Sequence, residues 1–325
     1  MGYIGITMGD PAGVGAEIIL KSMYQNISLL QNCIVFGSKE VLDYYNQLLG
    51  YHFSIKVIND VEPAFTQTLR VVDPCPLSMS DFQIGEVSPV CGDAAFHYVT
   101  TAIQWALDKK TDAVVTAPLN KEALHLGGHN YDGHTEIFDH YAGTGRYAMV
   151  LWSDKMKVIH VSTHVSLSEA CRRAKKDRIK EVIHLAYETL KQAGYKNPRI
   201  GVAGLNPHCG ENGIFGREEI DEIRPAVNTC KEEGIPVDGP IAPDTVFLKM
   251  YQGSYDMIVA MYHDQGHIPL KLLAFNDGVN MTVGLSIIRT SVDHGTAFDI
   301  AGKGIADPTS MLAAINAAKQ FSKED

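Results

Sequence analysis

The sequence predicts an α/β fold with two domains and a largely parallel sheet. Short apolar runs alternate with amphipathic helical segments along the chain, and this alternation is typical of parallel strands connected by helices. Several runs, such as 113–116 (AVVT), are apolar on both faces, which indicates strands buried inside a sheet. The length of 325 residues fits two domains or one large α/β unit.

The first part of the chain alternates strand and helix. The expected strands and helices, in chain order, are 3–7, 16–23, 33–36, 39–49, 92–109 and 113–116. Apolar residues share one face of the helix expected over 92–109, namely Ala95, Val99, Ala102, Ile103 and Ala106. These periods place one side of each helix against the strands.

The middle of the chain departs from strict alternation. Two strands, over 147–153 and 156–160, are close enough in sequence to form a hairpin or a bent strand pair. A helix follows over 176–193, and Gly194 is its expected C-terminal stop. Two further short apolar strands are expected over 199–203 and 257–260.

The domain boundaries are not marked by linkers. The sequence has no internal repeat, low-complexity tract or Pro/Ser-rich segment, so the second domain continues from the first or is inserted into it. We expect the first domain over 1–125 and 285–325, and the second over 126–284.

Composition argues against several classes of protein. The formal net charge is -10 and basic residues are not clustered, so we expect no nucleic-acid partner. No window approaches 18 uninterrupted apolar residues, and the N-terminal residues resemble a first strand rather than a signal peptide. The six cysteines are scattered without a CxxC pair. We therefore expect a cytoplasmic enzyme with reduced thiols and no membrane partner.

The glycine-rich segment 9–15 (GDPAGVG) lies where a nucleotide loop often occurs. A Rossmann fingerprint requires a third glycine where Ile18 stands, and a P-loop requires G-K-[ST], which is absent from the sequence. A tight turn from strand to helix explains the glycines equally well.

Three of the thirteen histidines lie just beyond expected strands. His164, His208 and His263 follow the strands ending near 161, 203 and 260. Loops beyond the carboxyl ends of parallel strands form the ligand crevice of such sheets, so three imidazoles there could hold one divalent cation. The alternative is three unrelated loop histidines. We do not count Cys209 as a ligand, because neighbours in an extended chain point apart.

Two basic residues stand inside apolar stretches near the end of the chain. Lys271 and Arg289, with the polar Asn280 between them, would need a phosphate or carboxylate partner if they are buried. The alternative is that both are solvated surface residues.

Together these segments resemble the PdxA family of 4-hydroxythreonine-4-phosphate dehydrogenases. The matching stretches, in order along nearly the whole chain, are 8–15, 116–122, 133–136, 163–164, 206–208, 243–245 and 262–266. The resemblance implies a fold like that of isocitrate and isopropylmalate dehydrogenases, with two α/β domains in each chain. It implies that two chains form a homodimer with active sites at the subunit interface. It also implies an NAD or NADP cofactor and one divalent cation, Zn, Mg, Co or Mn.

The resemblance also assigns individual residues. His164, His208 and His263 match the metal ligands, and most metal and substrate residues fall in the second domain. Five residues match substrate-contacting positions: His134, Thr135, Lys271, Asn280 and Arg289. The segment 293–304 resembles the adenosine-side loop of the wider superfamily, with cofactor contacts expected at Asp293, His294, Gly295, Thr296 and Ala297.

His267 and the segment 151–160 are more similar to a sister subfamily. Its members oxidise 4-phosphorylated four-carbon acids such as 4-phospho-D-threonate and 4-phospho-D-erythronate. His267 could donate to or accept from a hydroxyl at C2, and when protonated it would repel an ammonium there. The alternatives are that His267 packs at the crevice rim, and that the substrate is 4-hydroxythreonine-4-phosphate. Ala16 replaces the family's usual proline, with little consequence for a helix.

The implied reaction is an oxidation followed by decarboxylation. A divalent cation would stabilise the charge that develops on the alcohol oxygen, while a base takes the proton and hydride passes to the nicotinamide. The candidate bases are Asp244, Lys271 and a metal-bound water. A metal hydrolase and a non-catalytic binding protein on the same scaffold remain as alternatives of a different class.

Overall fold

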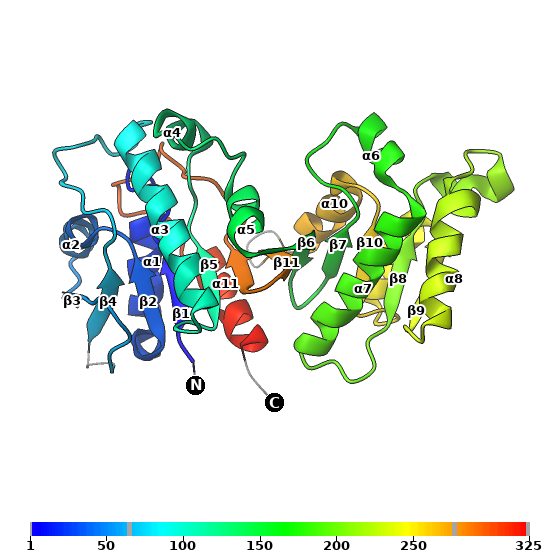
Figure 1. The fold of residues 1–325 in the computed structure, drawn as a ribbon, viewed down its shortest axis with the longest axis horizontal. Helices are drawn as coiled ribbons and strands as arrows, with labels where there is room; N and C mark the ends of the chain where they lie inside the picture. Colours follow the sequence, from blue (N-terminus) through cyan, green and yellow to red (C-terminus); the bar gives the residue numbers. More distant parts are fainter. Residues whose placement is uncertain (1, 64–66, 275–277, 323–325) are drawn as a thin grey trace. The chain divides into compact units, whose positions relative to one another are not determined.

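The computed structural model describes residues 2–63, 67–274 and 278–322 (Figure 1). It is an α/β protein whose strand pairs are mostly parallel, as the sequence predicts. The chain forms two compact units, Met1–Thr144 with Leu285–Asp325, and Gly145–Gly284. No helix in the described ranges is both long and apolar enough to cross a membrane.

The first crossing between the units differs from the expected boundary. It follows residue 144 rather than 125, because the helix α5 (His134–Ala142) packs against α3 (Pro89–Leu107) of the first unit. His134 and Thr135 therefore lie in the same unit as Arg289, and not in the second unit with the three histidines.

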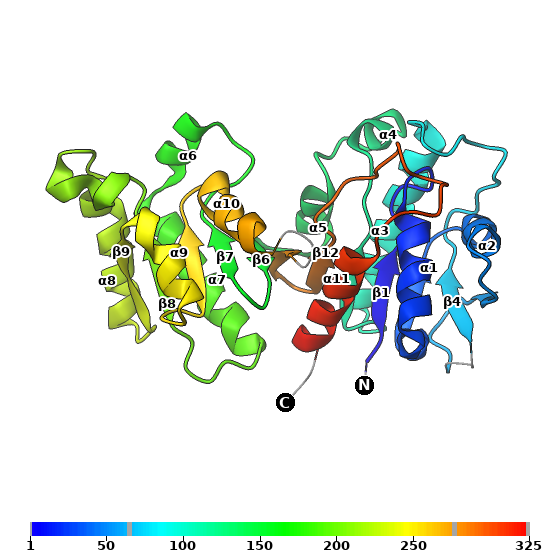
Figure 2. The same cartoon turned by 180° about the vertical axis from the view of Figure 1, so that it is seen from behind.

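The first unit is a parallel sheet in the order β3-β4-β2-β1-β5-β12. Its strands are β1 (Ile4–Thr7), β2 (Cys33–Phe36), β3 (Ser54–Val57), β4 (Thr68–Val72), β5 (Ala113–Thr116) and β12 (Ile288–Ser291). Its helices are α1 (Gly15–Gln25), α2 (Lys39–Leu48), α3, α4 (Lys121–Leu126), α5 and α11 (Thr309–Phe321), with the short helix η1 (Ile27–Gln31). Helices α1 and α11 pack together on one side of β1 (Figure 2), and α3 contacts β1 from the other side.

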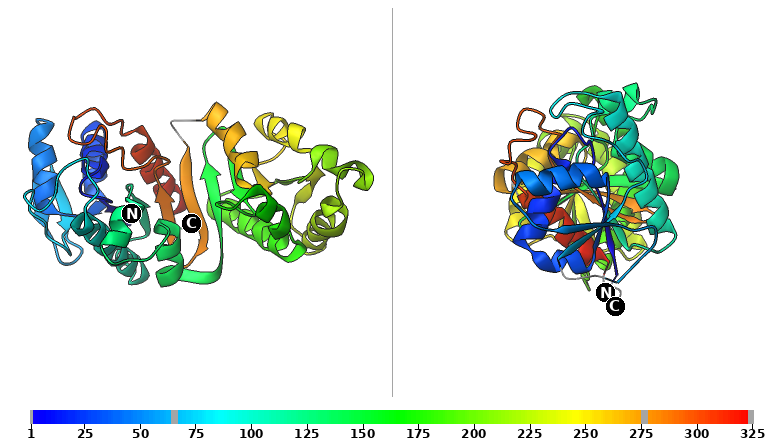
Figure 3. Two further views of the ribbon diagram at one scale, coloured as in Figure 1. Left: turned by 90° about the horizontal axis from the view of Figure 1, so that it is seen from above. Right: turned by 90° about the vertical axis from the view of Figure 1, so that its left-hand side faces the viewer.

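The second unit has the strand order β11-β6-β7-β10-β8-β9. Its strands are β6 (Gly143–Trp152), β7 (Lys157–His160), β8 (Ile200–Ala203), β9 (Val237–Ile241), β10 (Met257–Ala260) and β11 (Val279–Leu285). Its helices are α6 (Leu167–Arg173), α7 (Lys176–Gln192), α8 (Arg224–Glu232), α9 (Pro243–Tyr251) and α10 (His263–Leu273), with the short segments η2 (Pro207–Gly213) and η3 (Glu219–Ile223). The expected hairpin is the antiparallel pair β6–β7, and within each unit helices flank the strands on both sides (Figure 3).

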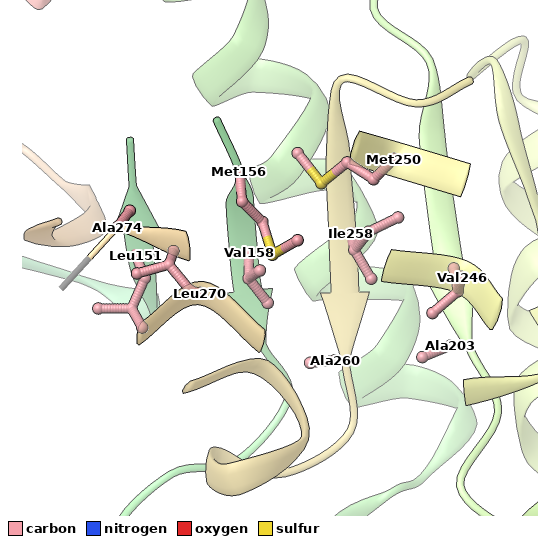
Figure 4. Packing of buried hydrophobic residues seen from close by; sticks show 10 residues of the cluster. All are labelled: Leu151, Met156, Val158, Ala203, Val246, Met250, Ile258, Ala260, Leu270 and Ala274. Carbon is pink, nitrogen blue, oxygen red and sulfur yellow. The ribbon is translucent and has the colours of Figure 1, made fainter. Parts of the chain in front are cut away.

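A buried apolar cluster fixes α9 and α10 on the strands of the second unit (Figure 4). Its members are Leu151, Met156, Val158, Ala203, Val246, Met250, Ile258, Ala260, Leu270 and Ala274. Helix α10 lies very close to β7, because a Cβ atom on Gly266 would stand 2.4 Å from Nε2 of His160. Only glycine allows this approach, which sets where the first residues of α10 lie.

The glycine-rich segment is the tight turn between β1 and α1. Gly9 has φ +70°, and a Cβ atom there would stand 2.1 Å from the carbonyl oxygen of Pro118. Gly15 begins α1 and would similarly clash with the carbonyl oxygen of Met8, at 1.9 Å. Both glycines are thus required by the turn itself.

Candidate functional site

The three candidate metal ligands follow three neighbouring parallel strands. β10 pairs in parallel with β7 on one side and with β8 on the other. His164 follows β7, His208 follows β8, and His263 begins α10 just after β10. The carboxyl ends of parallel strands meet at one edge of a sheet, so all three histidines belong to that edge of the second unit.

Two of these rings are neighbours. The ring centroids of His164 and His263 are 5.7 Å apart. Nδ1 of His263 lies 2.7 Å from a carboxylate oxygen of Asp264, which can only accept a hydrogen bond, so Nδ1 carries the proton. This tautomer leaves the lone pair of Nε2 available, as is usual for a metal-binding histidine oriented by a carboxylate.

The third histidine lies on an unusual loop. His208 to Asn212 all have positive φ, between 44° and 75°, so this segment is a left-handed turn. The premise that Cys209 and His208 belong to an extended chain is therefore wrong. The buried carboxylate of Glu219 holds the loop, accepting hydrogen bonds from the backbone N–H groups of Leu205 and Asn206 at 2.8 and 2.7 Å.

In the structure the ligand atoms of the three histidines do not lie close enough together to share one cation. The His208 side chain is 69% exposed, with Nδ1 3.8 Å from a carboxylate oxygen of Glu211. Within the described ranges, the one group of three potential ligand atoms that all lie within 4.8 Å of one another is elsewhere in this unit. The donor chemistry and the placement after the strands fit a divalent cation, and the ring of His208 stands away from the other two.

His267 forms a stacked column with the candidate ligand His263. The two ring centroids are 3.5 Å apart with the planes at 12°, and His160 lies 4.9 Å from His267 on the strand side. Burial lowers the pKa of His160 to about 3, so this ring is neutral. His267 is buried rather than placed at a rim, and its Nδ1 lies 2.9 Å from the carbonyl oxygen of His263. Because Nδ1 donates there, Nε2 of a neutral His267 can only accept.

The first unit contains a buried cation with an aromatic neighbour. Arg289 on β12 is buried, its Nη2 donates to the Thr116 hydroxyl at 3.1 Å, and its guanidinium carbon lies 5.5 Å from the centre of the Phe138 ring. Burial lowers the pKa of Arg289 to about 10, so it keeps its charge at neutral pH. The sequence predicted that a buried Arg289 would need an acceptor, and a protein hydroxyl supplies part of that need.

His134 shares the electrostatic environment of Arg289. It begins α5, and burial together with the positive charge of Arg289 holds the pKa of His134 well below its usual value. Its Nε2 is buried and makes no hydrogen bond within the described part of the chain. A buried polar atom without a partner beside a guanidinium indicates a place where a polar ligand could bind. Thr135 is next along α5 and is half-buried.

The remaining predicted site residues are distributed over the second unit. Lys271 is in the last turn of α10, and Asp244 is exposed in the first turn of α9. Burial is the largest cause that raises the pKa of the Cys209 thiol, and the negative charges of Glu219 and Asp244 raise this pKa further. Asn280 lies on β11, and its buried Oδ1 has no hydrogen-bond partner among the described residues.

The predicted cofactor loop packs on the glycine-rich turn. The backbone N–H of Val14 donates to the carbonyl oxygen of Thr296 at 3.1 Å, and a Cβ atom on Gly13 would press on the same residue at 3.0 Å. Asp293 is held through its N–H to Ser310, and Ala297 has φ 46°. His294 and Gly295 are exposed between them.

The structure adds two residues that the sequence did not single out. Glu17, buried on α1, accepts a hydrogen bond from the backbone N–H of Ala306 at 2.7 Å. Lys21, one turn later, lies 2.8 Å from Glu17 and donates to the carbonyl oxygens of Gly304 and Ala306. This pair holds the segment that leaves the predicted cofactor loop. The available signal was a Glu and a Lys four residues apart in an otherwise apolar helix.

Asp10 in the glycine-rich turn is also a buried acid. The backbone N–H of Ala12 donates to its Oδ1 at 2.9 Å, whereas its Oδ2 has no partner within the described residues. Burial raises the pKa of Asp10 from 3.8 to about 6, although the hydrogen bond from Ala12 opposes this shift. Part of the strand-to-helix turn therefore titrates close to neutral pH.

Comparison with known proteins agrees with the motifs and the fold. Residues 29–318 match the family described as "Pyridoxal phosphate biosynthetic protein PdxA". The chain belongs to the PdxA family. A PdxA family relative from Salmonella typhimurium, named D-threonate 4-phosphate dehydrogenase, is 48% identical over 98% of both chains.

Solved structures support the same assignment. The crystal structure named 4-hydroxythreonine-4-phosphate dehydrogenase from Klebsiella pneumoniae is 46% identical and superposes with a TM-score of 0.92, covering 99% of this PdxA family chain and 100% of that chain. Isocitrate dehydrogenase from Methylococcus capsulatus, at 14% identity and a TM-score of 0.51 over 98% of this chain and 88% of its own, shares the fold. The expected isocitrate dehydrogenase-like fold is thereby confirmed.

We predict that ionisation of Asp10 lowers the free energy of unfolding as the pH rises from about 4 to about 6. The folded state prefers the neutral acid, so the stability is fully present below the ordinary pKa and is lost as Asp10 ionises in the unfolded chain. The loss amounts to at most about 3 kcal/mol for a shift of about two pKa units. Urea unfolding of Asp10→Asn and of the parent, at both ends of this range, measures it.

The control is Asp154→Asn, which changes an exposed acid. Asp10→Asn should be stabilised relative to the parent at the upper pH by more than at the lower pH, and Asp154→Asn should not. If both variants follow the parent at both pH values, Asp10 is ionised without cost in the folded protein.

Proposed function

We propose that this PdxA family member is a metal-dependent, NAD- or NADP-dependent dehydrogenase. Its substrate is a 4-phosphorylated four-carbon 3-hydroxy acid, which it oxidises with decarboxylation. The preferred substrates are 4-phospho-D-threonate and 4-phospho-D-erythronate. The observation that carries the proposal is the placement of His164, His208 and His263 after three adjacent parallel strands, in a chain 48% identical to a D-threonate 4-phosphate dehydrogenase.

The three histidines would hold one divalent cation. Neutral imidazoles suit Zn²⁺ and Co²⁺, whereas Mg²⁺ and Mn²⁺ would need additional oxygen ligands. When bound, the cation supplies a positive charge that stabilises negative charge on the reacting oxygen. His263 is already oriented for this by Asp264, whereas the His208 loop must bring its ring toward the other two.

A buried cation would hold the charged phosphate or carboxylate of the substrate. Arg289 is a buried guanidinium that is charged at neutral pH and suited to a phosphate or carboxylate, and the neutral His134 is close enough to experience its charge. Thr135, which follows His134 on α5, would add a hydroxyl. A phosphate far from the reacting carbon contributes binding energy that positions the substrate. Asn280 would contribute an amide to the same substrate.

The proton of the alcohol needs a base, and two residues of this chain can accept one. Asp244 is an exposed carboxylate beside the His208 loop, and Lys271 is half-buried on α10. Lys271 would serve only if it is deprotonated in the complex. The nicotinamide cofactor takes the hydride, and the loop from Asp293 to Ala297 would bind its adenosine side. The protein would act as a cytoplasmic homodimer.

Lys271 and His267 together favour a hydroxyl at C2. They are four residues apart on α10 and therefore share a face. With Nδ1 donating to the carbonyl oxygen of His263, Nε2 of a neutral His267 can only accept a hydrogen bond, and a Lys271 ammonium can only donate. A hydroxyl can donate to the first and accept from the second, whereas an ammonium would be repelled by a protonated Lys271. A protonated Lys271 would leave Asp244 as the base. The alternative substrate, 4-hydroxythreonine-4-phosphate, is supported by the name of the Klebsiella pneumoniae structure.

We predict that replacing His164, His208 or His263 by alanine lowers the metal content and the turnover of the enzyme. Each loss removes one of three protein ligands, so the divalent cation should bind far more weakly. Metal content is measured after dialysis, and turnover with and without added metal. His125→Ala, on α4 of the first unit, is the matched control. Full metal content and near-normal turnover in all three variants would show that the cation binds elsewhere.

We predict that Arg289→Met lowers kcat/KM by roughly 10–150-fold for the phosphorylated substrate. A charge-assisted hydrogen bond contributes about 1.5–3 kcal/mol, which corresponds to this range. Lys271→Met is measured in parallel, because either cation could meet the phosphate. The loss should largely disappear for the dephosphorylated substrate, and Arg146→Ala, which breaks an exposed ion pair, should change neither. An equal loss for both substrates would exclude phosphate recognition.

The substrate class is tested with a panel of 4-phospho-D-threonate, 4-phospho-D-erythronate and 4-phosphohydroxy-L-threonine. Formation of reduced nicotinamide with any of them excludes both a metal hydrolase and a non-catalytic binding protein. We expect higher kcat/KM for the hydroxy acids, and a smaller difference in His267→Leu, which loses the acceptor. A tenfold or greater preference for the amino acid would instead assign the enzyme to the vitamin B6 branch.

A further inference from the structure

Three potential metal ligands of different chemistry meet where two helices of the second unit pack together. His184 lies in the middle of α7, Cys230 in the last turn of α8, and Glu233 directly after α8. One ligand atom from each lies within 4.8 Å of the other two. The helices α7 and α8 are packed against each other (Figure 1), and the cluster connects His184 with Glu233, 49 residues further along the chain.

In the structure His184 is hydrogen-bonded to Glu233, and Lys180 contacts both Glu233 and Cys230. Nε2 of His184 lies 2.7 Å from one carboxylate oxygen of Glu233, and the other oxygen accepts from Lys180 at 2.5 Å. The Cys230 side chain is fully buried, with its sulfur 4.0 Å from the carbonyl oxygen of Lys180. Burial raises the pKa of the Cys230 thiol to about 11, so the thiol is protonated at neutral pH.

We propose that His184, Cys230 and Glu233 bind a thiophilic divalent cation such as Zn²⁺ and thereby connect α7 to α8. Sulfur, imidazole nitrogen and carboxylate oxygen are the donor set that Zn²⁺ prefers, and a thiolate disfavours Mg²⁺ and Ca²⁺. Three protein ligands leave one coordination position for water. The site is distinct from the three histidines at the strand ends and does not depend on the proposed function.

Binding requires three changes in the cluster. The cation replaces the proton on Cys230, so one proton is released and a sulfur–metal bond forms, with no change of oxidation state. Nε2 of His184 donates its proton to Glu233, so coordination through Nε2 requires that proton to move to Nδ1 of the same ring. The cation must also displace Lys180 from Glu233, because two positive charges would compete for one carboxylate. Two consequences follow. The apparent affinity should rise about tenfold per pH unit below the thiol pKa, and removing the charge of Lys180 should strengthen binding.

The test uses Co²⁺ alone as the probe, added to the metal-free full chain. A sulfur-to-cobalt charge-transfer band in the near ultraviolet should appear and should be abolished by added Zn²⁺. The three histidines contain no sulfur, so this band reports the new site even if Co²⁺ also binds there. The band should be absent in Cys230→Ser and weakened at least tenfold in apparent affinity in His184→Ala.

Three variants serve as controls and keep the outcome decisive. Cys209→Ser and His263→Ala should retain the band, and Lys180→Met should show tighter binding than the parent. His184→Ala changes a partly exposed residue, so it tests the site if the buried Cys230→Ser fails to fold. The proposal is overturned if the parent shows no band, if the band survives in Cys230→Ser, or if it is lost in Cys209→Ser instead.

Discussion

The parallel pairing of β7, β10 and β8 is the constraint on which the candidate metal site depends. Parallel strands share one carboxyl edge, so three residues far apart in sequence are brought to that edge. Hydrogen bonds between the segments that follow the strands, from Ser162 to Met261 and from Gln265 to Gly204, hold them together there. The apolar cluster beneath the edge then fixes α10 on β7. The missing side chain of Gly266 lets α10 approach His160 on β7. This close approach sets the positions of His263 and His267, which lie on the same helix.

Desolvation explains why ionisable groups in both units differ from their usual behaviour. Burial favours the neutral forms of Asp10, His134 and His160, whereas Arg289 remains charged because its pKa starts so high. Such groups cost stability unless a ligand or a hydrogen bond compensates them, and they are therefore concentrated at functional sites. The charged Arg289, with the neutral His134 in its field, is suited to an anionic substrate.

The local pattern of the sequence was sufficient for the most apolar strands and for the positions of the histidines, but it did not reveal β3, β4, β9, β11 or β12. A continuous apolar run such as 257–260 is typical of a strand that is buried on both faces, and this run is buried at every position. The residues that follow it therefore lie at the edge of the sheet. Features that depend on distant contacts were not predictable. The left-handed turn at His208 is held by Glu219, and α5 belongs to the first unit because it packs on α3. No local pattern in the sequence encodes either contact.

The tautomer of His267 changes what the sister-subfamily resemblance implies. From sequence, His267 could donate to or accept from a hydroxyl at C2, and when protonated it would repel an ammonium there. In the structure Nδ1 lies within hydrogen-bond distance of the carbonyl oxygen of His263, so Nε2 of a neutral His267 can only accept, and an ammonium could donate to it as well as a hydroxyl could. Discrimination must therefore come from a second group that donates or repels. Lys271, one turn further along α10, is the residue of this helix with that chemistry, so the two side chains are needed together.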